Sequence, residues 1–486
     1  MMKFSLLFSD ICNAEFGDIE NKTIYNLSLD RSFKTICSSQ EEYHYFLETL
    51  SKPLVQKKDI LFRHEIISDL LRNPLLFDAL NASLTEFEML KKEFKTLKKE
   101  ILDRNFGIRS ALGGTKVSVR ESSQLLKKFL IYLKDLDSLL SRYPISSEGL
   151  CTISRYTSAF VKKDTMDKLI SLLEQTENLC IQSNIDTVIK LDENGKISNC
   201  HLMDPKILND IIVPERKKFT LRKNHIESTP YVQLSPPMYS DSQNTIRAYP
   251  YLEMETLLTS MIGALVDRFG DLNKEIRFYS VIVKYVRLLE QNNIPFTLPS
   301  IGESTHFVGM TDLFLLMTKV ETDIVTNDFY IYDDKKGSIV LGDNGNGKTV
   351  FLRSIAVCQI LAQAGMPIPA QSGTIAAFKT IKTQFSESEE ITLSTEKMGR
   401  FEQEVKELCA LIDQSKSGSF LFLNEIFQTT AYSEGAIGLY HILNYLSAKN
   451  IGWVLVTHLT DLKQYFENQN VSIYHITKEH KVAQIQ

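Results

Sequence analysis

Residues 342–349 read Gly-Asp-Asn-Gly-Asn-Gly-Lys-Thr and combine three glycines with a lysine and a threonine hydroxyl. A glycine-rich backbone can curl so that several N–H groups point at one anion, and the spacing matches G-x-x-x-x-G-K-[ST] in full. We therefore predict a loop that binds the phosphates of ATP. Lys348 neutralises the β- and γ-phosphates and Thr349 ligates Mg²⁺. The cradle is formed by Gly342, Asn344, Gly345 and Gly347.

Two further polar segments follow apolar runs later in the chain. Residues 420–425 read Phe-Leu-Phe-Leu-Asn-Glu, and residues 453–458 read Trp-Val-Leu-Val-Thr-His. A strand that ends before Asn424 places that side chain beside Mg²⁺ and lets Glu425 polarise the attacking water as a general base. His458 then follows the next strand and is positioned to sense the γ-phosphate. A lone histidine at a strand end more often has a structural role, but here it follows two matched motifs.

Asn424 stands where this kind of site usually has an aspartate. Asparagine keeps an acceptor oxygen for the metal shell but lacks the negative charge that holds a metal-bound water. We therefore expect a magnesium-dependent ATPase whose hydrolysis is slow.

Several other classes of protein are excluded by composition. The seven cysteines are never spaced as C-x-x-C, and the nine histidines include no H-E-x-x-H, so we expect no disulfide framework and no metal other than Mg²⁺. The sequence has no apolar stretch of about 18 residues and no signal-like N-terminus. We therefore expect a cytoplasmic protein with no membrane segment.

The elements that must hold the site form an alternating pattern. Short apolar runs predict strands, and a helix over residues 350–361 follows the glycine-rich loop. Strands that alternate with helices form a parallel sheet with right-handed crossovers. The predicted strands are residues 338–341, 375–381, 420–423 and 453–456.

The first 300 residues show a different pattern. An Asn-Gly turn between residues 187–191 and 197–202 predicts a small β-hairpin inside a long-helix scaffold. Apolar residues recur at helical spacing on both sides of it. The predicted helices are residues 42–51, 60–71, 85–105, 122–141, 164–183 and 252–291.

The order of these motifs resembles the ATPase domain of the MutS family of DNA mismatch-repair and recombination proteins. The resemblance rests on several short segments in the family's order and spacing. They are Ile324–Asp328, Gly365–Ala370, Phe401–Glu404, Asn424–Ile426 with Thr430 and Gly435, Thr457-His458 and Tyr474-His475.

The resemblance implies an ABC-type ATPase with two composite sites across a homodimer. Asn327 would then contact the nucleotide, and Gly399 with Arg400 would stand where the signature Ser-Thr reaches the opposing γ-phosphate. Ile324 replaces an aromatic residue that stacks on adenine, and Phe427-Gln428-Thr429 replaces G-R-G. With Asn424, these departures leave phosphate binding intact and favour slow hydrolysis.

The resemblance also divides the chain into four parts. They are a helical core and lever (1–185), a β-containing clamp (186–250), returning lever helices (251–320) and a P-loop ATPase domain (321–486). Residues 1–40 are too short for the mismatch-reading and connector domains and contain no F-x-E wedge motif. DNA binding without mismatch reading is therefore expected.

The charge distribution permits contact with DNA in the first part of the chain. The net charge is −5, and residues 321–486 hold 14 basic and 19 acidic side chains, which leaves 41 of each in residues 1–320. Five basic residues cluster in the clamp and predict sequence-independent contact with the DNA backbone, although an ordinary charged loop is the alternative. They are Arg216, Lys217, Lys218, Arg222 and Lys223.

A second lysine-rich stretch lies in the helix predicted over residues 85–105. Its lysines could touch phosphate, but Glu88, Glu93 and Glu100 interleave with them, which favours a plain solvated face. The lysines are Lys91, Lys92, Lys95, Lys98 and Lys99.

Two functions remain open from the sequence. The first is an ATP-gated clamp on DNA in repair or recombination, acting as a dimer and with a possible repair-protein partner. The second is a nucleotide-dependent switch that docks a protein partner through a degenerate ATPase site.

Overall fold

The protein is described by a computed structural model over residues 5–105, 111–181, 187–191, 197–202, 240–318, 324–331, 337–385, 400–427, 432–467 and 469–485. The chain divides into two compact units, which we describe separately. The sheet unit comprises Met1–Asn81, Tyr143–Ile153 and Lys274–Gln486, and the helical unit comprises Ala82–Arg142 and Ser154–Asn273.

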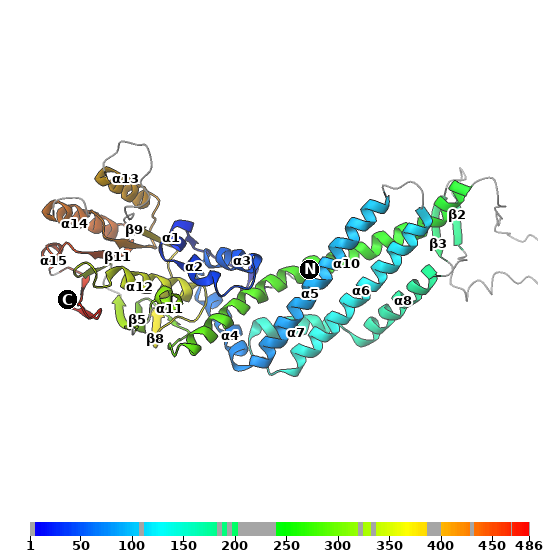
Figure 1. Ribbon diagram of the computed structural model, residues 1–486, viewed down its shortest axis with the longest axis horizontal. Coiled ribbons are helices and arrows are strands. Elements are labelled where there is room, and N and C mark those ends of the chain that lie inside the picture. Colours follow the sequence, from blue (N-terminus) through cyan, green and yellow to red (C-terminus); the bar gives the residue numbers. More distant parts are fainter. Residues whose placement is uncertain are drawn as a thin grey trace, which may run out of the picture. The chain divides into compact units, whose positions relative to one another are not determined.

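The sheet unit is built on a seven-stranded sheet, whose strands lie among α12 and α14 in Figure 1. All neighbouring strands are parallel except the last pair, so the predicted parallel sheet is confirmed. In spatial order the strands are β1 (Asp18–Ile19), β9 (Thr380–Phe385), β10 (Ser419–Asn424), β11 (Gly452–Thr457), β7 (Gly337–Leu341), β12 (Val471–Ile476) and β13 (Val482–Gln484).

The register of three central strands brings their carboxyl ends together. Asn424 of β10 pairs with Val456 of β11, and Thr457 of β11 pairs with Leu341 of β7. Ligands of parallel α/β sheets bind beyond the carboxyl ends of the strands. The loops after β7, β10 and β11 therefore meet at one edge.

The helix that follows β7 is α12 (Lys348–Gln363), and it is buried along almost its whole length. Gln363 near its end donates to the carbonyls of Leu54 and Phe378, at 3.0 and 2.9 Å. The buried Arg63 guanidinium donates to the carbonyl of Ala364 at 2.7 Å and to that of Leu7 at 3.0 Å. Buried polar groups need such partners, so these bonds fix the helix in one position.

A smaller sheet consists of β4 (Ser300–Ile301), β8 (Ser372–Ile375), β5 (Thr305–Met310) and β6 (Asn327–Ile331). The single strand predicted over residues 375–381 is wrong, because β8 and β9 belong to different sheets. The backbone between β8 and β9 forms hydrogen bonds with side chains instead of with a neighbouring strand. The Gln359 side-chain amide donates to the carbonyl of Ala376, and Gln363 accepts from the N–H of Phe378.

Short helices complete the sheet unit, and an N-terminal segment supplies its edge strand β1. No sequence pattern pointed to β1, which is only two residues long. The helices are the 3₁₀ turn Ile11–Asn13, α1 (Asn21–Asn26), α2 (Leu29–Lys34), α3 (Gln40–Leu50), α4 (Lys57–Arg72), α11 (Leu313–Met317), α13 (Arg400–Asp413), α14 (Tyr432–Ala448) and α15 (Leu462–Tyr465).

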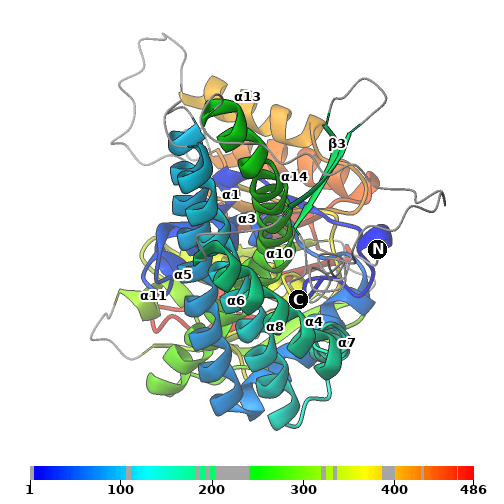
Figure 2. The same cartoon turned by 90° about the vertical axis from the view of Figure 1, so that its right-hand side faces the viewer.

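The helical unit contains long helices that run beside one another, as Figure 2 shows for α5, α6 and α8. They are α5 (Pro74–Asn105), α6 (Ala111–Arg142), α7 (Glu148–Phe160), α8 (Lys163–Ile181) and α10 (Ser240–Gln291), of which α5, α7 and α10 also give residues to the sheet unit. The predicted helices are confirmed, but α7 was missed, and α10 begins twelve residues before the predicted residue 252 and contains Pro250.

The predicted hairpin strands are also present, as β2 (Thr187–Leu191) and β3 (Ile197–Leu202). The Asn-Gly turn between them lies outside the described residues. The division of the chain into four parts with a clamp and a lever stays a prediction. Within the described ranges, none of the helices combines the length and apolar character needed to cross a bilayer.

Candidate nucleotide site

The glycine-rich loop after β7 needs glycine for its backbone geometry. Gly345 and Gly347 have φ angles of 85° and 89°, a left-handed region that glycine adopts without strain. A Cβ at Gly342 would lie 3.0 Å from the carbonyl oxygen of Ile476. Gly347 also precedes the first turn of α12, so unpaired N–H groups of the helix end face the loop.

Lys348 is buried, and its ammonium group lies among oxygen atoms. Its Nζ atom lies 2.8 Å from the carbonyl oxygen of Gly342 and 3.2 Å from Oδ1 of Asn344. It also forms an ion pair of 2.9 Å with Oε1 of Glu425, whose side chain is 8% exposed. The phosphate-loop lysine and the predicted general base are therefore in direct contact.

The end of β10 meets the first turn of α12. The Thr349 hydroxyl donates to Oδ1 of Asn424 at 3.0 Å, so the two predicted Mg²⁺ ligands are adjacent. Both offer neutral oxygen atoms. Mg²⁺ binds such oxygens together with water and the phosphates of its nucleotide, so the pair fits a magnesium ion of that kind.

Glu425 links β10 to β11. Its N–H donates to the carbonyl of Val456 at 2.9 Å, and its Oε2 atom lies 2.6 Å from Nδ1 of His458. The His458 ring meets the Tyr432 ring edge-on, with centroids 5.2 Å apart. His458 is thus held from two sides, and the three residues predicted at these strand ends, Asn424, Glu425 and His458, lie together with the loop.

Two residues of this site were not assigned a role from the sequence. Phe427, directly after the predicted motif, has a φ angle of 64°, and its N–H donates to Oε2 of Glu404 at 3.1 Å. Glu404 belongs to α13 and was noted only for its match to the signature segment. Glu425 has a φ angle of 50°, so the backbone after β10 is strained at two non-glycine residues.

Asn327 makes contacts that differ from the one the family resemblance implies. Its Nδ2 atom donates to the carbonyl of His480 at 3.0 Å, and its Oδ1 accepts from the N–H of Val482 at 2.9 Å. Nδ1 of His480 in turn lies 3.0 Å from the carbonyl oxygen of Asn346 in the loop. Asn327 therefore supports the β12–β13 turn beside the loop, and its contact with nucleotide stays a prediction.

The remaining predicted site residues cannot be placed. Gly399 lies outside the described residues, and Arg400 is described only as the first backbone position of α13. The five basic residues also lie outside the described part of the chain. They are Arg216, Lys217, Lys218, Arg222 and Lys223.

Nearby ionisable groups do not offer a competing chemistry. Burial raises the pKa of the Cys358 thiol in α12, and the carboxylate of Asp312 adds to the effect, so this cysteine stays a protonated core residue. Within the described residues, no three His, Cys, Asp or Glu side chains gather closely enough to hold a metal. This leaves the loop and the strand ends as the candidate site.

Fold and site together define an α/β domain with a loop of the phosphate-binding type at the carboxyl ends of its strands. The sequence profile of MutS domain V matches residues 338–486, which include β7, α12, β10 and β11.

The similar curated proteins are endonucleases MutS2. The protein of Clostridium novyi is 23% identical over 357 residues, which cover 69% of this chain and 42% of that protein. Those of Streptococcus uberis and Acetivibrio thermocellus are 30% and 31% identical over 142 and 143 residues, in each case 29% of this chain and 18% of the relative. The chain thus spans less than half the length of these relatives. Residues 338–486 are thus similar to domain V of MutS proteins, and a longer part of the chain is similar to MutS2 proteins.

Proposed function

We propose that this protein is a MutS-like ATPase that uses ATP and Mg²⁺ to control its binding to DNA. One observation carries the nucleotide part of this proposal. The two carboxylate oxygens of Glu425 lie 2.9 Å from Lys348 Nζ and 2.6 Å from His458 Nδ1. A single carboxylate therefore connects the phosphate loop with the ends of β10 and β11.

ATP binding rests on the loop and on the start of α12. The N–H groups around Gly345 and Gly347, together with the helix end, provide positive charge for phosphate oxygens. Lys348 moves its ammonium group from Glu425 to the β- and γ-phosphates, a short rearrangement because its Nζ atom already lies within the loop. Thr349 and Asn424 would hold Mg²⁺, and the ion would supply positive charge beside the phosphates.

Hydrolysis depends on Glu425 as the general base and on His458 as the residue that orients it. Once phosphate attracts Lys348, the Glu425 carboxylate is left with His458 and is available to accept a proton from the attacking water. Asn424 supplies no charge to a water in the metal shell, so the rate is low.

A homodimer through the ATPase domains completes the site. In this arrangement Gly399 and Arg400 of one protomer approach the γ-phosphate bound by the other. The bond from Phe427 N–H to Glu404 supports this role, because it ties the helix that starts at Arg400 to the loop carrying Glu425. Nucleotide at one site is thereby coupled to the segment that reaches the second site.

DNA contact is assigned to the region around the β2–β3 hairpin, with residues 186–250 as the clamp and the long helices as levers. The continuity of α10 supports this assignment, because one helix gives residues to both units. The basic residues between 216 and 223 contact the DNA backbone. We place the activity in the cytoplasm, and the free thiols of the six described cysteines are consistent with a reducing compartment.

Duplex DNA binding with and without ATP tests this proposal. Replacing Arg216, Lys217, Lys218, Arg222 and Lys223 with glutamine should reduce the slope of log affinity against log salt by about 4, since each phosphate contact contributes about 0.9. A control with the same charge change replaces exposed lysines of the sheet unit, namely Lys57, Lys58, Lys406, Lys416 and Lys449. If the protein binds no DNA at low salt in either condition, the clamp is refuted.

A nucleotide-dependent switch that docks a protein partner is the second candidate, favoured by Asn424 and by the strained backbone at Glu425 and Phe427. Phosphate release separates the two functions. For an ATPase, Glu425→Gln lowers the rate by about 10²- to 10⁴-fold while ATP still binds. For a switch, the unmodified protein binds ATP tightly and releases no phosphate above the rate of the Gln variant.

A further inference from the structure

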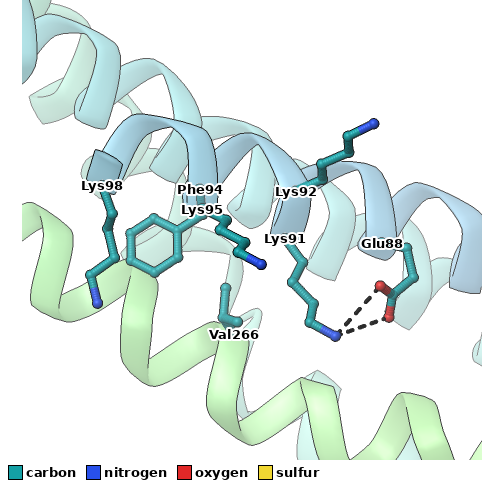
Figure 3. Close-up of a pocket in the computed structure, with 7 residues that line it drawn as sticks. All are labelled: Glu88, Lys91, Lys92, Phe94, Lys95, Lys98 and Val266. Atoms are coloured by element: carbon teal, nitrogen blue, oxygen red, sulfur yellow. Dashed lines mark hydrogen bonds and ion pairs between the residues drawn. The ribbon is translucent and has the colours of Figure 1, made fainter. Parts of the chain in front are cut away.

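An open groove of about 540 Å³ lies along α5 in the helical unit. Figure 3 shows its lining side chains, which come from α5 except for Val266 of α10. Four of the seven lining residues are lysines, and Glu88 is the single acid among them. The lining residues are Glu88, Lys91, Lys92, Phe94, Lys95, Lys98 and Val266.

Helical spacing aligns three of these lysines. Lys91, Lys95 and Lys98 stand at positions i, i+4 and i+7 and therefore share one face of α5. Figure 3 shows all three directed toward α10, whereas Lys92 points away from it. At about 1.5 Å per residue, they extend over roughly 10 Å of the helix axis.

The floor of the groove is apolar. Phe94 is 6% exposed, and its ring lies beside Gly263 of α10. The Lys98 ammonium lies 5.3 Å from the centroid of the same ring. Apolar surface beneath the lysine stems keeps the ammonium groups at the rim, where they reach a ligand without being buried.

The acids that interleave with these lysines offset only part of the charge in the groove. Glu93 forms an ion pair of 2.6 Å with Lys128 of α6, and Glu88 is 3.5 Å from Lys91, which is long for a strong pair. Lys95 and Lys98 make no ion pair or hydrogen bond within the described part of the chain. The lining therefore keeps an excess of positive charge, and the plain solvated face expected from the sequence stays the alternative.

The array fits a linear polyanion. DNA carries a phosphate on each strand for about every 3.4 Å of its axis, so a lysine row of roughly 10 Å matches about three phosphates of one strand. The lining contains no arginine, asparagine or glutamine, its lysine ammonium groups are point charges that suit phosphates, and Phe94 is buried too deeply to stack on a base. The groove thus has the chemistry of contact with the backbone alone.

We propose that Lys91, Lys95 and Lys98 form a second DNA-backbone site on α5. It is separate from the basic cluster at residues 216–223 and does not depend on ATP. Duplex DNA bound in the groove contacts α5 directly. Because α5 gives residues to both units, bound DNA biases the position of this helix.

Salt-dependent binding of a duplex by the full chain tests this site. Lys91→Gln, Lys95→Gln and Lys98→Gln together should weaken binding about tenfold at 100 mM salt and reduce the salt slope by about 3, with or without ATP. The control replaces Lys57, Lys58 and Lys416, which are exposed and carry the same total charge. Circular dichroism verifies that each variant keeps its helices.

The outcomes separate this site from the proposed function. If the groove variant binds DNA like the control, the groove site is refuted, whether or not the variant at residues 216–223 is impaired. If the groove variant binds DNA more weakly, and ATP changes DNA binding of neither the unmodified protein nor the groove variant, the groove site stands and ATP gating fails. If the groove variant loses binding to polyglutamate but binds DNA unchanged, the groove binds an acidic protein, and the DNA site is again refuted.

Discussion

The loops after β7 and β10 both turn through left-handed backbone, but they do so with different residues. The phosphate loop uses Gly345 and Gly347, for which φ angles of 85° and 89° carry no steric cost. The loop after β10 uses Glu425 and Phe427 at 50° and 64°, where a side chain costs about 1–2 kcal/mol per residue. The loop predicted to bind the phosphates of ATP has an unstrained backbone, and the loop predicted to take part in ATP hydrolysis has a strained one.

Surrounding contacts hold the strained loop in place. Val456 and Glu404 accept from the N–H groups of Glu425 and Phe427, and the Phe427 ring is buried in the core beneath α14. Strain that persists against such contacts is typical of functional sites. We therefore expect phosphate binding and ATP hydrolysis to be separable, so that substitutions in each loop affect one and not the other.

The largest expected effect is on nucleotide affinity. Lys348→Ala should weaken ATP binding about a thousandfold, because it removes the cation that pairs with the phosphates. Lys382→Ala is a matched control, since Lys382 is also a buried lysine of the sheet unit but pairs with Glu20. Titration calorimetry measures both variants. ATP affinity that falls equally in the two would remove the special role of Lys348.

An intermediate effect is expected on stability at the strained loop. Phe427→Ala should lower the free energy of unfolding by about 3 kcal/mol through lost packing. Phe427→Gly should be about 1 kcal/mol more stable than Phe427→Ala, because glycine removes the left-handed strain that alanine keeps.

A buried position within a helix provides the control for this order of stability, in which glycine exceeds alanine. At Leu439 in α14, glycine should be about 1 kcal/mol less stable than alanine, the usual order in a helix. Urea denaturation measures the four variants. The same order of alanine and glycine at both positions contradicts strain at Phe427.

The smallest expected effect concerns the backbone of the phosphate loop. Gly345→Ala should cost about 1 kcal/mol of stability, although no atom lies within 4 Å of the added methyl group, because φ is 85°. Gly270→Ala in α10 has equal space but no positive φ and should stabilise the helix by up to about 1 kcal/mol. If both changes stabilise the protein, the loop conformation is wrong.

The central strands and long helices were predictable because each carries its own periodic signal. Residues 338–341, 420–423 and 453–456 are buried apolar runs, and β7, β10 and β11 contain them within one or two residues at each end. The split between β8 and β9 was not predictable, because it depends on glutamines of α12 that satisfy the intervening backbone. Strand β1 was missed because its pairing with β9 spans about 360 residues and leaves no local pattern.

The site shows the same limit. Motif spacing placed Lys348, Glu425 and His458 in one region, and the register of the sheet explains why they meet. The supporting contacts of Glu404 and His480 depend on α13 and on the β12–β13 turn, whose positions relative to the loop no spacing rule gives. The buried Arg63 below α12 likewise has no signal in the sequence.

Asn424→Asp tests most directly the central claim that the phosphate loop is intact and that the end of β10 limits hydrolysis. ATP affinity and the single-turnover rate are measured on the same preparation, with Asn424→Gln as the uncharged control. We predict that aspartate raises the rate about tenfold, equivalent to about 1.4 kcal/mol, and leaves ATP affinity within about twofold. An unchanged rate, or an equal increase with glutamine, would contradict the account.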